Sequence, residues 1–346
     1  MSNIFIPYPN YGEVITGGQI YDHYFIDRII ASKKHSVSFM TSRMSLLKNN
    51  PVFKFRTIKK YDVVISNSRL YSSLILLWLV LRLFSKCQII CFHHHFNYMS
   101  YRGWKRLVHY IFEKSLLSLC TSVIIPSPYV RDVFKKIFPR KKIFYAELGV
   151  KQMPVHTVKY PKNNKELIFV GTVVNQRKGL HFLIEALNII KGNGIDFNCT
   201  VVGMIREGKY YQLLKEKIKK YNLENNISFT GHIQDDKLAD YYNAAAVFVF
   251  PSTLEGYGMV LIEAMAFGLP VIAFNNSAMP YTVKDGINGL LVKNKDIADL
   301  ALKISTLLSD SALCSKLSQG ALQTSLHTRK MSDMDVDIDK FLQDIK

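Results

Sequence analysis

Two glutamates, Glu255 and Glu263, stand eight positions apart around a glycine-rich turn. Gly256 and Gly258 in that turn allow the backbone to approach a ligand closely, and a helix that begins near Met259 would offer unpaired N–H groups to an anion. A carboxylate can also accept hydrogen bonds from two neighbouring hydroxyls, such as those of a sugar or a ribose. Glu263 alone would suit a solvated helix face, but the paired spacing and the glycines together predict a site for a phosphorylated sugar.

Two adjacent cations, Arg177 and Lys178, follow an apolar stretch that ends at Gly171 and precede a stretch with helical periodicity. They could neutralise a departing diphosphate, since charge-assisted hydrogen bonds contribute about 1.5–3 kcal/mol each. A solvated loop is the alternative. Their place after a strand favours phosphate binding, because open α/β sheets bind ligands outside the carboxyl ends of their strands.

The N-terminal half carries two weaker signals. Gly17 and Gly18 lie between the first expected strand and a helix, where they indicate either a ligand-binding loop or a simple helix-entry turn. His93, His94 and His95 close another expected strand. Consecutive strand residues point to opposite faces, so the three histidines cannot all converge on one ion, and a metal site is disfavoured.

The segment from Glu255 to Glu263 resembles the E-x7-E element of retaining GT-B glycosyltransferases, and the second half of the chain is similar to glycosyltransferase family 4 (glycosyl transferases group 1). Residues 285–292 extend this similarity. The resemblance implies that Glu263 holds the ribose of a nucleotide-sugar donor. It also implies that Glu255 lies beside the transferred sugar and the phosphates, together with the backbone amides of Gly256, Tyr257, Gly258 and Met259.

The same resemblance implies roles for other positions. Lys178 corresponds to the lysine that grips the diphosphate. The family commonly has an arginine directly after the strand glycine, but this chain has Thr172 there, so either Arg177 takes its place or the grip is weaker. His93 matches a histidine that contacts the donor sugar, with His94 and His95 left open as alternatives. The remaining implied donor-binding positions are Gly17, Gly18, Gly171, Gly203 and Ile233.

Short apolar runs rich in β-branched and aromatic residues alternate with helix-length segments, which predicts an α/β fold with parallel sheets. Strands are expected near Asn3–Pro7, His35–Met40, Asp62–Ser66, Gln88–Phe92, Ser122–Pro126, Lys142–Ala146, Glu166–Gly171, Phe197–Val202, Ile227–Thr230, Val247–Pro251, Pro270–Phe274 and Gly289–Val292. The resemblance implies the GT-B arrangement of two facing Rossmann-like domains.

We expect residues 1–150 to form an N-terminal acceptor-binding domain and residues 165–325 to form a C-terminal nucleotide-sugar-binding domain. Residues 326–346 form a C-terminal tail that could pack back on the first domain. The linker is expected between Gly149 and Lys165, where two prolines and a polar stretch interrupt any periodicity. The apolar window from Leu74 to Phe84 contains Arg82 and is too short to span a bilayer, so we expect a buried helix there.

Composition narrows the class of protein. The 346 residues are 48% hydrophobic and 21% charged, which is typical of a globular chain. The five cysteines show no paired spacing, and the N-terminus shows no signal peptide, so we expect a cytoplasmic protein.

Residues 1–150 carry 22 Lys and Arg against 7 Asp and Glu, a net charge of +15, whereas the remainder carries +3. Cations mixed with aromatic residues favour an anionic membrane surface over a solvated face, and no base-reading motif supports nucleic acid.

The sequence therefore predicts a retaining, metal-independent hexosyltransferase that extends a glycan, most simply a lipid-linked one, in cell-surface polysaccharide synthesis at the inner face of the membrane. The donor is expected to be a UDP-sugar, with a GDP-sugar as the alternative, and no cofactor is expected. Two other functions stay open. One is a sugar-nucleotide epimerase or phosphorylase on the same scaffold, and the other is a non-catalytic basic module that binds membrane or nucleic acid.

Overall fold

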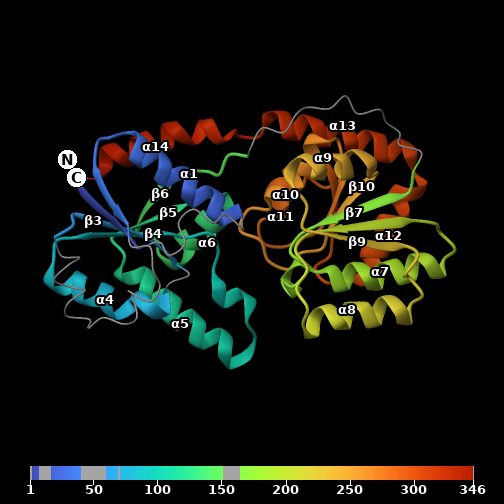
Figure 1. Ribbon diagram of the computed structural model, residues 1–346, viewed down its shortest axis with the longest axis horizontal. Helices are drawn as coiled ribbons and strands as arrows, with labels where there is room; N and C mark the ends of the chain where they lie inside the picture. Colours follow the sequence, from blue (N-terminus) through green and yellow to red (C-terminus); the bar gives the residue numbers. More distant parts are fainter. Residues whose placement is uncertain (1, 8–16, 40–59, 69–70, 151–163, 346) are drawn as a thin grey trace. The chain divides into compact units, whose positions relative to one another are not determined.

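The structure is a computed structural model of the 346-residue chain, and it describes residues 2–7, 17–39, 60–68, 71–150 and 164–345. The chain forms two compact units (Figure 1). The first comprises Met1–Gly149 and Arg329–Lys346, and the second comprises Val150–Thr328. Most of the predicted linker, residues 151–163, lies outside the described residues.

The first unit is built on a six-stranded parallel sheet with the order β2-β1-β3-β4-β5-β6. Its strands are β1 (Asn3–Ile6), β2 (Ser36–Phe39), β3 (Val63–Asn67), β4 (Gln88–Phe92), β5 (Ser122–Ile125) and β6 (Lys142–Tyr145). The central strands are short, almost continuous runs of Val and Ile, buried at every position of β3 and β5. Such runs are typical of parallel strands that helices cover on both faces.

Helices cover both faces of this sheet (Figure 1). On one face lie α1 (Gly17–Ala31) and α14 (Met334–Asp344), and on the other lie α4 (Tyr71–Phe84) and α5 (Gly103–Leu119). The helix α6 (Pro128–Ile137) shares the core of α4 and α5 through Val130 and Phe134. It begins where it does because Ser127 accepts a hydrogen bond from the Val130 amide (3.4 Å) and Pro128 occupies the first helical turn.

The last helix of the chain belongs to the first unit. The ring of Phe341 in α14 packs against Phe25 of α1 and Phe144 of β6, with centroids 5.1 Å and 4.9 Å apart. At the edge of this contact, Asp335 pairs with Arg28 (3.3 Å) and accepts a hydrogen bond from the Tyr24 hydroxyl (2.9 Å). Residues from the two ends of the chain therefore share one core.

The second unit contains another six-stranded parallel sheet, with the order β12-β11-β10-β7-β8-β9. The strands are β7 (Glu166–Val170), β8 (Asn198–Val202), β9 (Ile227–Gly231), β10 (Val247–Phe250), β11 (Val271–Phe274) and β12 (Gly289–Val292). The helices are α7 (Leu180–Gly192), α8 (Lys209–Lys220), α9 (Asp235–Ala244), α10 (Met259–Ala266), α11 (Met279–Thr282), α12 (Ile297–Ser309) and α13 (Ser311–His327). The chain order reverses between β7 and β10, which are hydrogen-bonded neighbours. Ligands of doubly wound sheets bind at such a reversal.

All twelve predicted strand positions carry a strand, and the α/β class is confirmed.

The expectation of a buried helix at Leu74–Phe84 is wrong for one face of α4. Trp78 and Leu81 are buried, but Leu79 and Leu83 are 42% and 65% exposed. Every residue of the window except Arg82 is apolar, so its composition could not show which side chains would face the sheet. Within the described ranges, no helix is both long and apolar enough to cross a bilayer.

Candidate functional site

The reversal of strand order in the second unit brings together two loops that lie far apart in sequence. After β7, the chain forms a short 3-10 helix, Gln176–Lys178, and after β10 it forms the glycine-rich turn that leads into α10. The Thr253 amide donates to the Arg177 carbonyl (2.8 Å), which ties the two loops together. Asn175 begins the 3-10 helix, because its side-chain oxygen accepts a hydrogen bond from the Arg177 amide (3.1 Å).

Gly179 allows the loop that carries Arg177 and Lys178 to pack closely against the end of β10. Its φ is +81°, in the left-handed region that glycine adopts without strain. A Cβ atom at this position would lie 1.9 Å from the Pro251 carbonyl oxygen. Only glycine therefore lets the loop carrying Lys178 lie directly against the end of β10.

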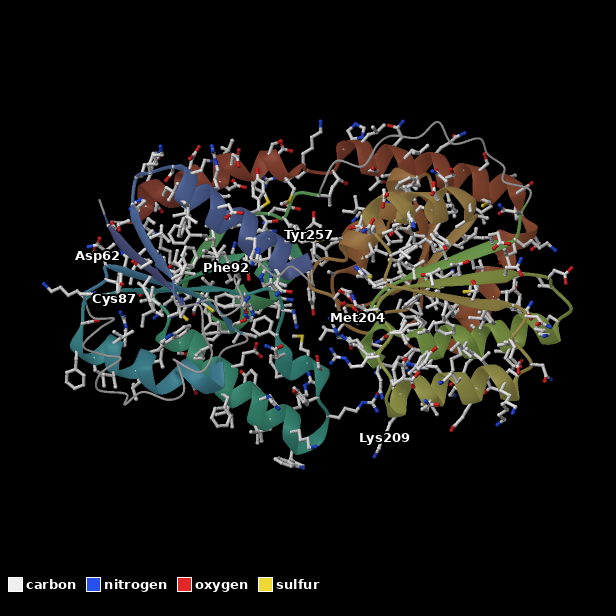
Figure 2. All side chains as sticks on the ribbon, viewed as in Figure 1. Asp62, Cys87, Phe92, Met204, Lys209 and Tyr257 are labelled. Atoms are coloured by element: carbon white, nitrogen blue, oxygen red, sulfur yellow. The ribbon has the colours of Figure 1, made fainter. Side chains whose placement is uncertain are left out.

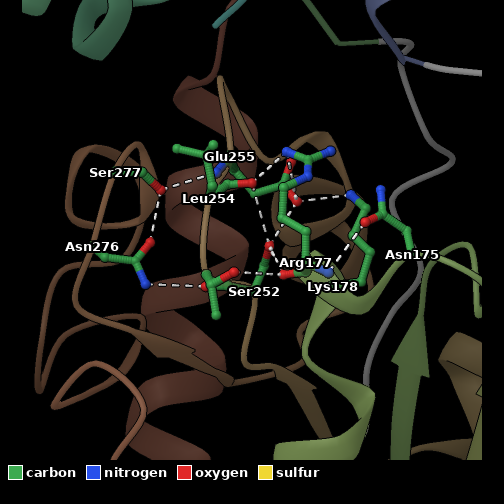
Figure 3. Close-up of polar contacts among 9 residues, drawn as sticks. Asn175, Arg177, Lys178, Ser252, Leu254, Glu255, Asn276 and Ser277 are labelled. Atoms are coloured by element: carbon green, nitrogen blue, oxygen red, sulfur yellow. Dashed lines mark hydrogen bonds and ion pairs between the residues drawn. The ribbon is translucent and has the colours of Figure 1, made fainter. Parts of the chain in front are cut away.

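Lys178, Arg177 and Glu255 form a compact ionic cluster (Figure 3). The Lys178 Nζ lies 2.8 Å from Glu255 Oε1, and Arg177 Nη1 lies 3.9 Å from the same oxygen. Burial would raise the pKa of the Glu255 carboxyl, but the Lys178 ammonium and the Arg177 guanidinium outweigh it and lower the pKa to about 2. Glu255 is therefore a carboxylate at neutral pH, and the cluster carries one net positive charge.

Sequence reasoning missed the polar side chains that hold Glu255. The fully buried Ser252 places its hydroxyl 2.8 Å from Glu255 Oε1, which is closer than its other acceptors, and a hydroxyl has a single proton to donate. The Glu255 amide donates to Ser277 Oγ (2.9 Å), and Ser277 Oγ donates to Asn276 Oδ1 (2.7 Å). The Asn276 amide group then donates to the Ser252 carbonyl (3.1 Å). Ser252 could have been found from its place beside the strand end, but Asn276 and Ser277 follow β11 and carry no local signal.

Arg177 and Lys178 are both positioned by further contacts. The Arg177 guanidinium donates to the Leu254 carbonyl, which anchors it to the turn before α10. The Lys178 ammonium also lies over the ring of Phe250, 5.0 Å from the ring centre. Their side chains are 21% and 18% exposed, so both cations are held in place and accessible to a ligand.

The predicted helix start at Met259 is confirmed, since α10 runs from Met259 to Ala266. Gly258 precedes it with φ +89°, and a Cβ there would come within 2.9 Å of the Met279 side chain. Gly256 and Tyr257 form the turn, and Figure 2 labels Tyr257 at this edge of the second unit. The first amides of α10 thus emerge from the loop that carries Glu255.

Glu263 lies one turn into α10 and contacts a different element from Glu255. Its carboxylate accepts a hydrogen bond from the hydroxyl of Tyr242 (3.4 Å), a buried residue of α9. The contacts of the two glutamates thus lead to different parts of the unit, namely α9 for Glu263 and the loop after β7 for Glu255. The ribose role of Glu263 stays a prediction.

Three other predicted donor-binding positions lie at the same edge of the second sheet. Gly171 follows β7, Gly203 follows β8 and Ile233 follows β9. Gly203 has φ +145°, and a Cβ there would lie 2.1 Å from the Gly171 carbonyl oxygen. These two strand ends are therefore packed backbone to backbone, with Met204 next in the chain (Figure 2).

In the first unit, the histidines after β4 have different surroundings. His93 is fully buried, its Nδ1 lies 3.3 Å from Ser68 Oγ, and its ring packs on Phe96 with centroids 4.4 Å apart. Burial, with smaller contributions from His95 and His94, lowers the pKa of His93 well below its usual value, so His93 is neutral. Its position is that of a core residue.

His94 instead lies beside Gly18, at the start of α1. Its Nε2 donates to the buried Asp22 carboxylate (2.7 Å), whose other oxygen accepts a hydrogen bond from the Asn67 side chain (2.7 Å). A Cβ at Gly18 would lie 3.5 Å from the His94 ring, so Gly18 and His94 are neighbours. Gly17 and Gly18 begin α1, while the rest of the predicted loop, residues 11–16, lies outside the described residues. Of the open alternatives, the geometry favours His94 over His93 for contact with a ligand.

Across the described parts of the chain, no group of three or more His, Cys, Asp or Glu side chains could hold a metal ion. His93 and His94 are adjacent in sequence, but their rings contact different residues, Ser68 and Asp22, and do not converge on one point.

Comparison with known proteins places the second unit in a family. Residues 156–324 match the family model of the glycosyl transferases group 1. An uncharacterized glycosyltransferase of Haemophilus influenzae is 26% identical over 255 residues, which are 73% of this chain and 67% of the relative. The capsular polysaccharide biosynthesis glycosyltransferase CapM of Staphylococcus aureus is 29% identical over 228 residues, 61% of this chain and 58% of the relative. The matches to several other relatives span only 42% of their length.

The fold also matches solved structures over the whole chain. Anabaena HepE in complex with UDP-glucose superposes with a TM-score of 0.77 at 17% identity, covering 99% of this chain and 100% of that one. This likeness, and the two six-stranded parallel sheets, identify the architecture. Residues 156–324 belong to the glycosyl transferases group 1 family, and the chain has the GT-B fold.

Proposed function

We propose that this protein is a retaining glycosyltransferase of family 4 that transfers a hexosyl unit from a nucleotide-diphosphate sugar to a glycan acceptor without a metal ion. The observation that carries the proposal is the cluster of Lys178, Arg177 and Glu255 at the strand-order reversal of the second unit. Its net positive charge suits a diphosphate. A UDP-sugar is the favoured donor, supported by the UDP-glucose complex of the structurally similar HepE, and a GDP-sugar is the alternative.

The chemistry follows from the charges in the cluster. The bond between the anomeric carbon and the diphosphate oxygen breaks, and negative charge builds on that oxygen. Lys178, Arg177 and the first amides of α10 stabilise this charge. Loss of one such preorganised donor raises the activation free energy by about 2.7–4 kcal/mol. The acceptor oxygen bonds to the anomeric carbon on the same face, and its proton passes to the departing phosphate.

Glu255 has a defined part in this scheme. Its pKa of about 2 leaves it without a proton to give at neutral pH, so it does not act as a general acid. Its carboxylate orients Lys178 and can accept a hydrogen bond from a hydroxyl of the transferred sugar. Glu263 holds the ribose, the backbone at Gly203 and Ile233 surrounds the base, and His94 contacts the donor sugar.

The acceptor is proposed to be a growing lipid-linked glycan in cell-surface polysaccharide synthesis, at the inner face of the membrane. The similarity to CapM, a capsular polysaccharide biosynthesis enzyme, and the net charge of +15 on residues 1–150 support this placement. Anionic lipids attract juxtamembrane cations with about 1 kcal/mol each.

The test begins with thermal unfolding in the presence of UDP and GDP, since a ligand at 100 times its dissociation constant stabilises a protein by about 2.7 kcal/mol. Sugar transfer is then measured for the wild type, for Lys178→Ala and for Lys293→Ala, a control lysine that is 81% exposed. Lys178→Ala should lower transfer by about 10²–10³-fold, whereas the control should not. Equal turnover of all three would refute the assigned diphosphate site, and activity that vanishes with EDTA and returns with manganese would refute the metal-free mechanism.

Product analysis separates the alternatives. Isomerised donor sugar without any acceptor product would identify an epimerase, which would use the same diphosphate site. Failure of every nucleotide to stabilise the protein would favour a non-catalytic basic module.

A further inference from the structure

The helix α5 presents two apolar faces. Its inner face is ordinary, with Leu116 and Leu117 buried in the core that also holds α4 and α6. Its outer face carries five large apolar side chains, between 36% and 72% exposed, namely Trp104, Leu107, Val108, Ile111 and Phe112. Their spacing of i, i+3, i+4, i+7 and i+8 places them along one stripe of the helix. We call these five residues the outer stripe.

The exposed charged side chains of α5, and of Arg102 just before it, are all positive. Arg102, Lys105, Arg106 and Lys114 lie at the start of the helix or beside the stripe, and all four are exposed. The helix contains a single acidic residue, Glu113, which is 1% exposed and points inward. Its carboxylate accepts hydrogen bonds from the amides of Asn97 and Tyr98 (both 3.1 Å). The solvent side of α5 is therefore apolar and cationic, with no negative side chain of its own.

The neighbouring helix extends the apolar surface. α4 packs beside α5 on the same face of the first sheet (Figure 1). Leu79 and Leu83, one turn apart on α4, are 42% and 65% exposed. Exposed apolar side chains that gather on two packed helices beside cations are typical of a binding surface.

We propose that the outer stripe of α5 docks the protein on an anionic lipid surface. The helix lies in the plane of the interface with Trp104, Leu107 and Ile111 among the acyl chains, while Lys105 and Lys114 pair with lipid phosphates. This inference deepens the proposed function, because it assigns the membrane contact of the transferase to one helix.

A second copy of the chain is a weaker occupant. Docking through the same stripe would bring the same cations of both copies together, and like charges at an interface oppose binding. Five side chains on one helix are also far fewer than the 20–30 residues that each partner contributes to a stable protein interface. A lipid surface satisfies both the apolar and the cationic groups.

Trp104 makes the test direct. The chain has two tryptophans, and Trp78 is buried, so a change in emission on binding reports Trp104. The full chain is mixed with vesicles of phosphatidylcholine and phosphatidylglycerol, or of phosphatidylcholine alone. We expect the emission to shift to shorter wavelength and acrylamide quenching to fall with the anionic vesicles only, and salt to weaken the effect.

Two double variants and one control test whether the apolar and the cationic side chains of α5 bind the vesicles. Leu107→Ser with Ile111→Ser should weaken vesicle binding by more than about tenfold. A matched double variant, Leu302→Ser with Leu326→Ser, removes two exposed leucines of the second unit, 64% and 53% exposed, and should bind like the wild type. Lys105→Glu with Lys114→Glu should abolish the preference for anionic vesicles.

Nucleotide-dependent thermal stabilisation is measured on the same samples. The stripe variant, Leu107→Ser with Ile111→Ser, should still be stabilised by the nucleotide. This result would show that the variant is folded and that vesicle docking is separate from donor binding. Wild-type protein that binds no vesicle, or a dimer that the stripe variant dissociates, would overturn the docking proposal while leaving the transferase proposal intact. Vesicle binding without any nucleotide effect would support docking and count against the transferase alone.

Discussion

Glu255 is buried, yet it keeps its negative charge because two cations and the Ser252 hydroxyl surround it. Its pKa of about 2 lies below the value of 4.5 expected for the unfolded chain. The ionised carboxylate therefore contributes to the unfolding free energy above pH about 4.5, and this contribution is lost as the pH falls towards 2. A shift of this size corresponds to about 3 kcal/mol.

The first prediction concerns Glu255→Gln, which removes this titration. We expect the unfolding free energy of the variant to fall less steeply between pH 5 and 3 than that of the wild type, because Gln has no proton to gain. Urea unfolding at several pH values measures the slope. Glu207→Gln, at a side chain that is 68% exposed, is the control and should follow the wild type. Parallel curves for all three proteins would contradict the pKa assigned to Glu255.

The second prediction concerns Asp22, whose buried carboxylate contacts the His94 ring and the Asn67 side chain. Asp22→Ala leaves His94 Nε2 without the carboxylate that fixes its ring. We expect kcat for transfer to fall about tenfold or more, the equivalent of one charge-assisted hydrogen bond. Nucleotide-dependent thermal stabilisation should be unchanged, since the proposed diphosphate-binding residues, Arg177 and Lys178, belong to the second unit.

His93→Gln is the comparison for that experiment. Because His93 is fully buried against Phe96, its replacement should lower the melting temperature and leave kcat of the folded protein unchanged. A kcat that falls for His93→Gln and not for Asp22→Ala would show that His93 is the histidine at the substrate.

At the scale of elements, the loop after β7 depends on the backbone of Gly179. Gly179→Ala combines a left-handed φ of +81° with a Cβ placed 1.9 Å from the Pro251 carbonyl. We expect it to destabilise the protein by more than about 1 kcal/mol and to weaken UDP binding, because the loop must move Lys178 away from Glu255.

A second glycine of the same unit serves as the control. A Cβ at Gly192, the last residue of α7, would meet no atom within 4 Å, and its φ is not positive. Gly192→Ala should therefore be neutral or stabilising by up to about 1 kcal/mol, with unchanged UDP binding. Differential scanning calorimetry with and without UDP measures both effects. A Gly179→Ala protein that matches Gly192→Ala would show that the loop is not constrained by Pro251.

At the scale of the whole molecule, the C-terminal helix completes the core of the first unit. Phe341 is 1% exposed and packs on residues from α1 and β6. Phe341→Ala should lower the unfolding free energy by about 3–5 kcal/mol, the range for removal of a buried aromatic side chain. Val336→Ala, on the same helix at a residue that is 60% exposed, should change it by less than about 0.5 kcal/mol. Guanidinium unfolding gives both values, and equal stability of the two variants would show that α14 does not close this core.

The sequence by itself determined the elements and their class. Runs such as Val63–Ile65 and Val247–Phe250 become strands because β-branched and aromatic residues fit the pleated, buried surface of a sheet. The turn from Glu255 to Met259 was likewise readable, since glycine spacing and a helix start are local features. The resemblance to a family also predicted that Lys178 and Glu255 lie near the same ligand, but it did not predict their direct ion pair.

Only the tertiary structure decided what each of these residues touches. Strand order places β7 beside β10, and this alone brings Lys178 within 2.8 Å of a glutamate 77 positions away. His93 and His94 are adjacent residues of the same type, yet the ring of His93 lies in the core beside Ser68 and the ring of His94 contacts Asp22. The outer stripe of α5 has the periodicity of any buried helix face. Periodicity fixes which side chains share a face, whereas only long-range packing fixes whether that face meets the core or the solvent.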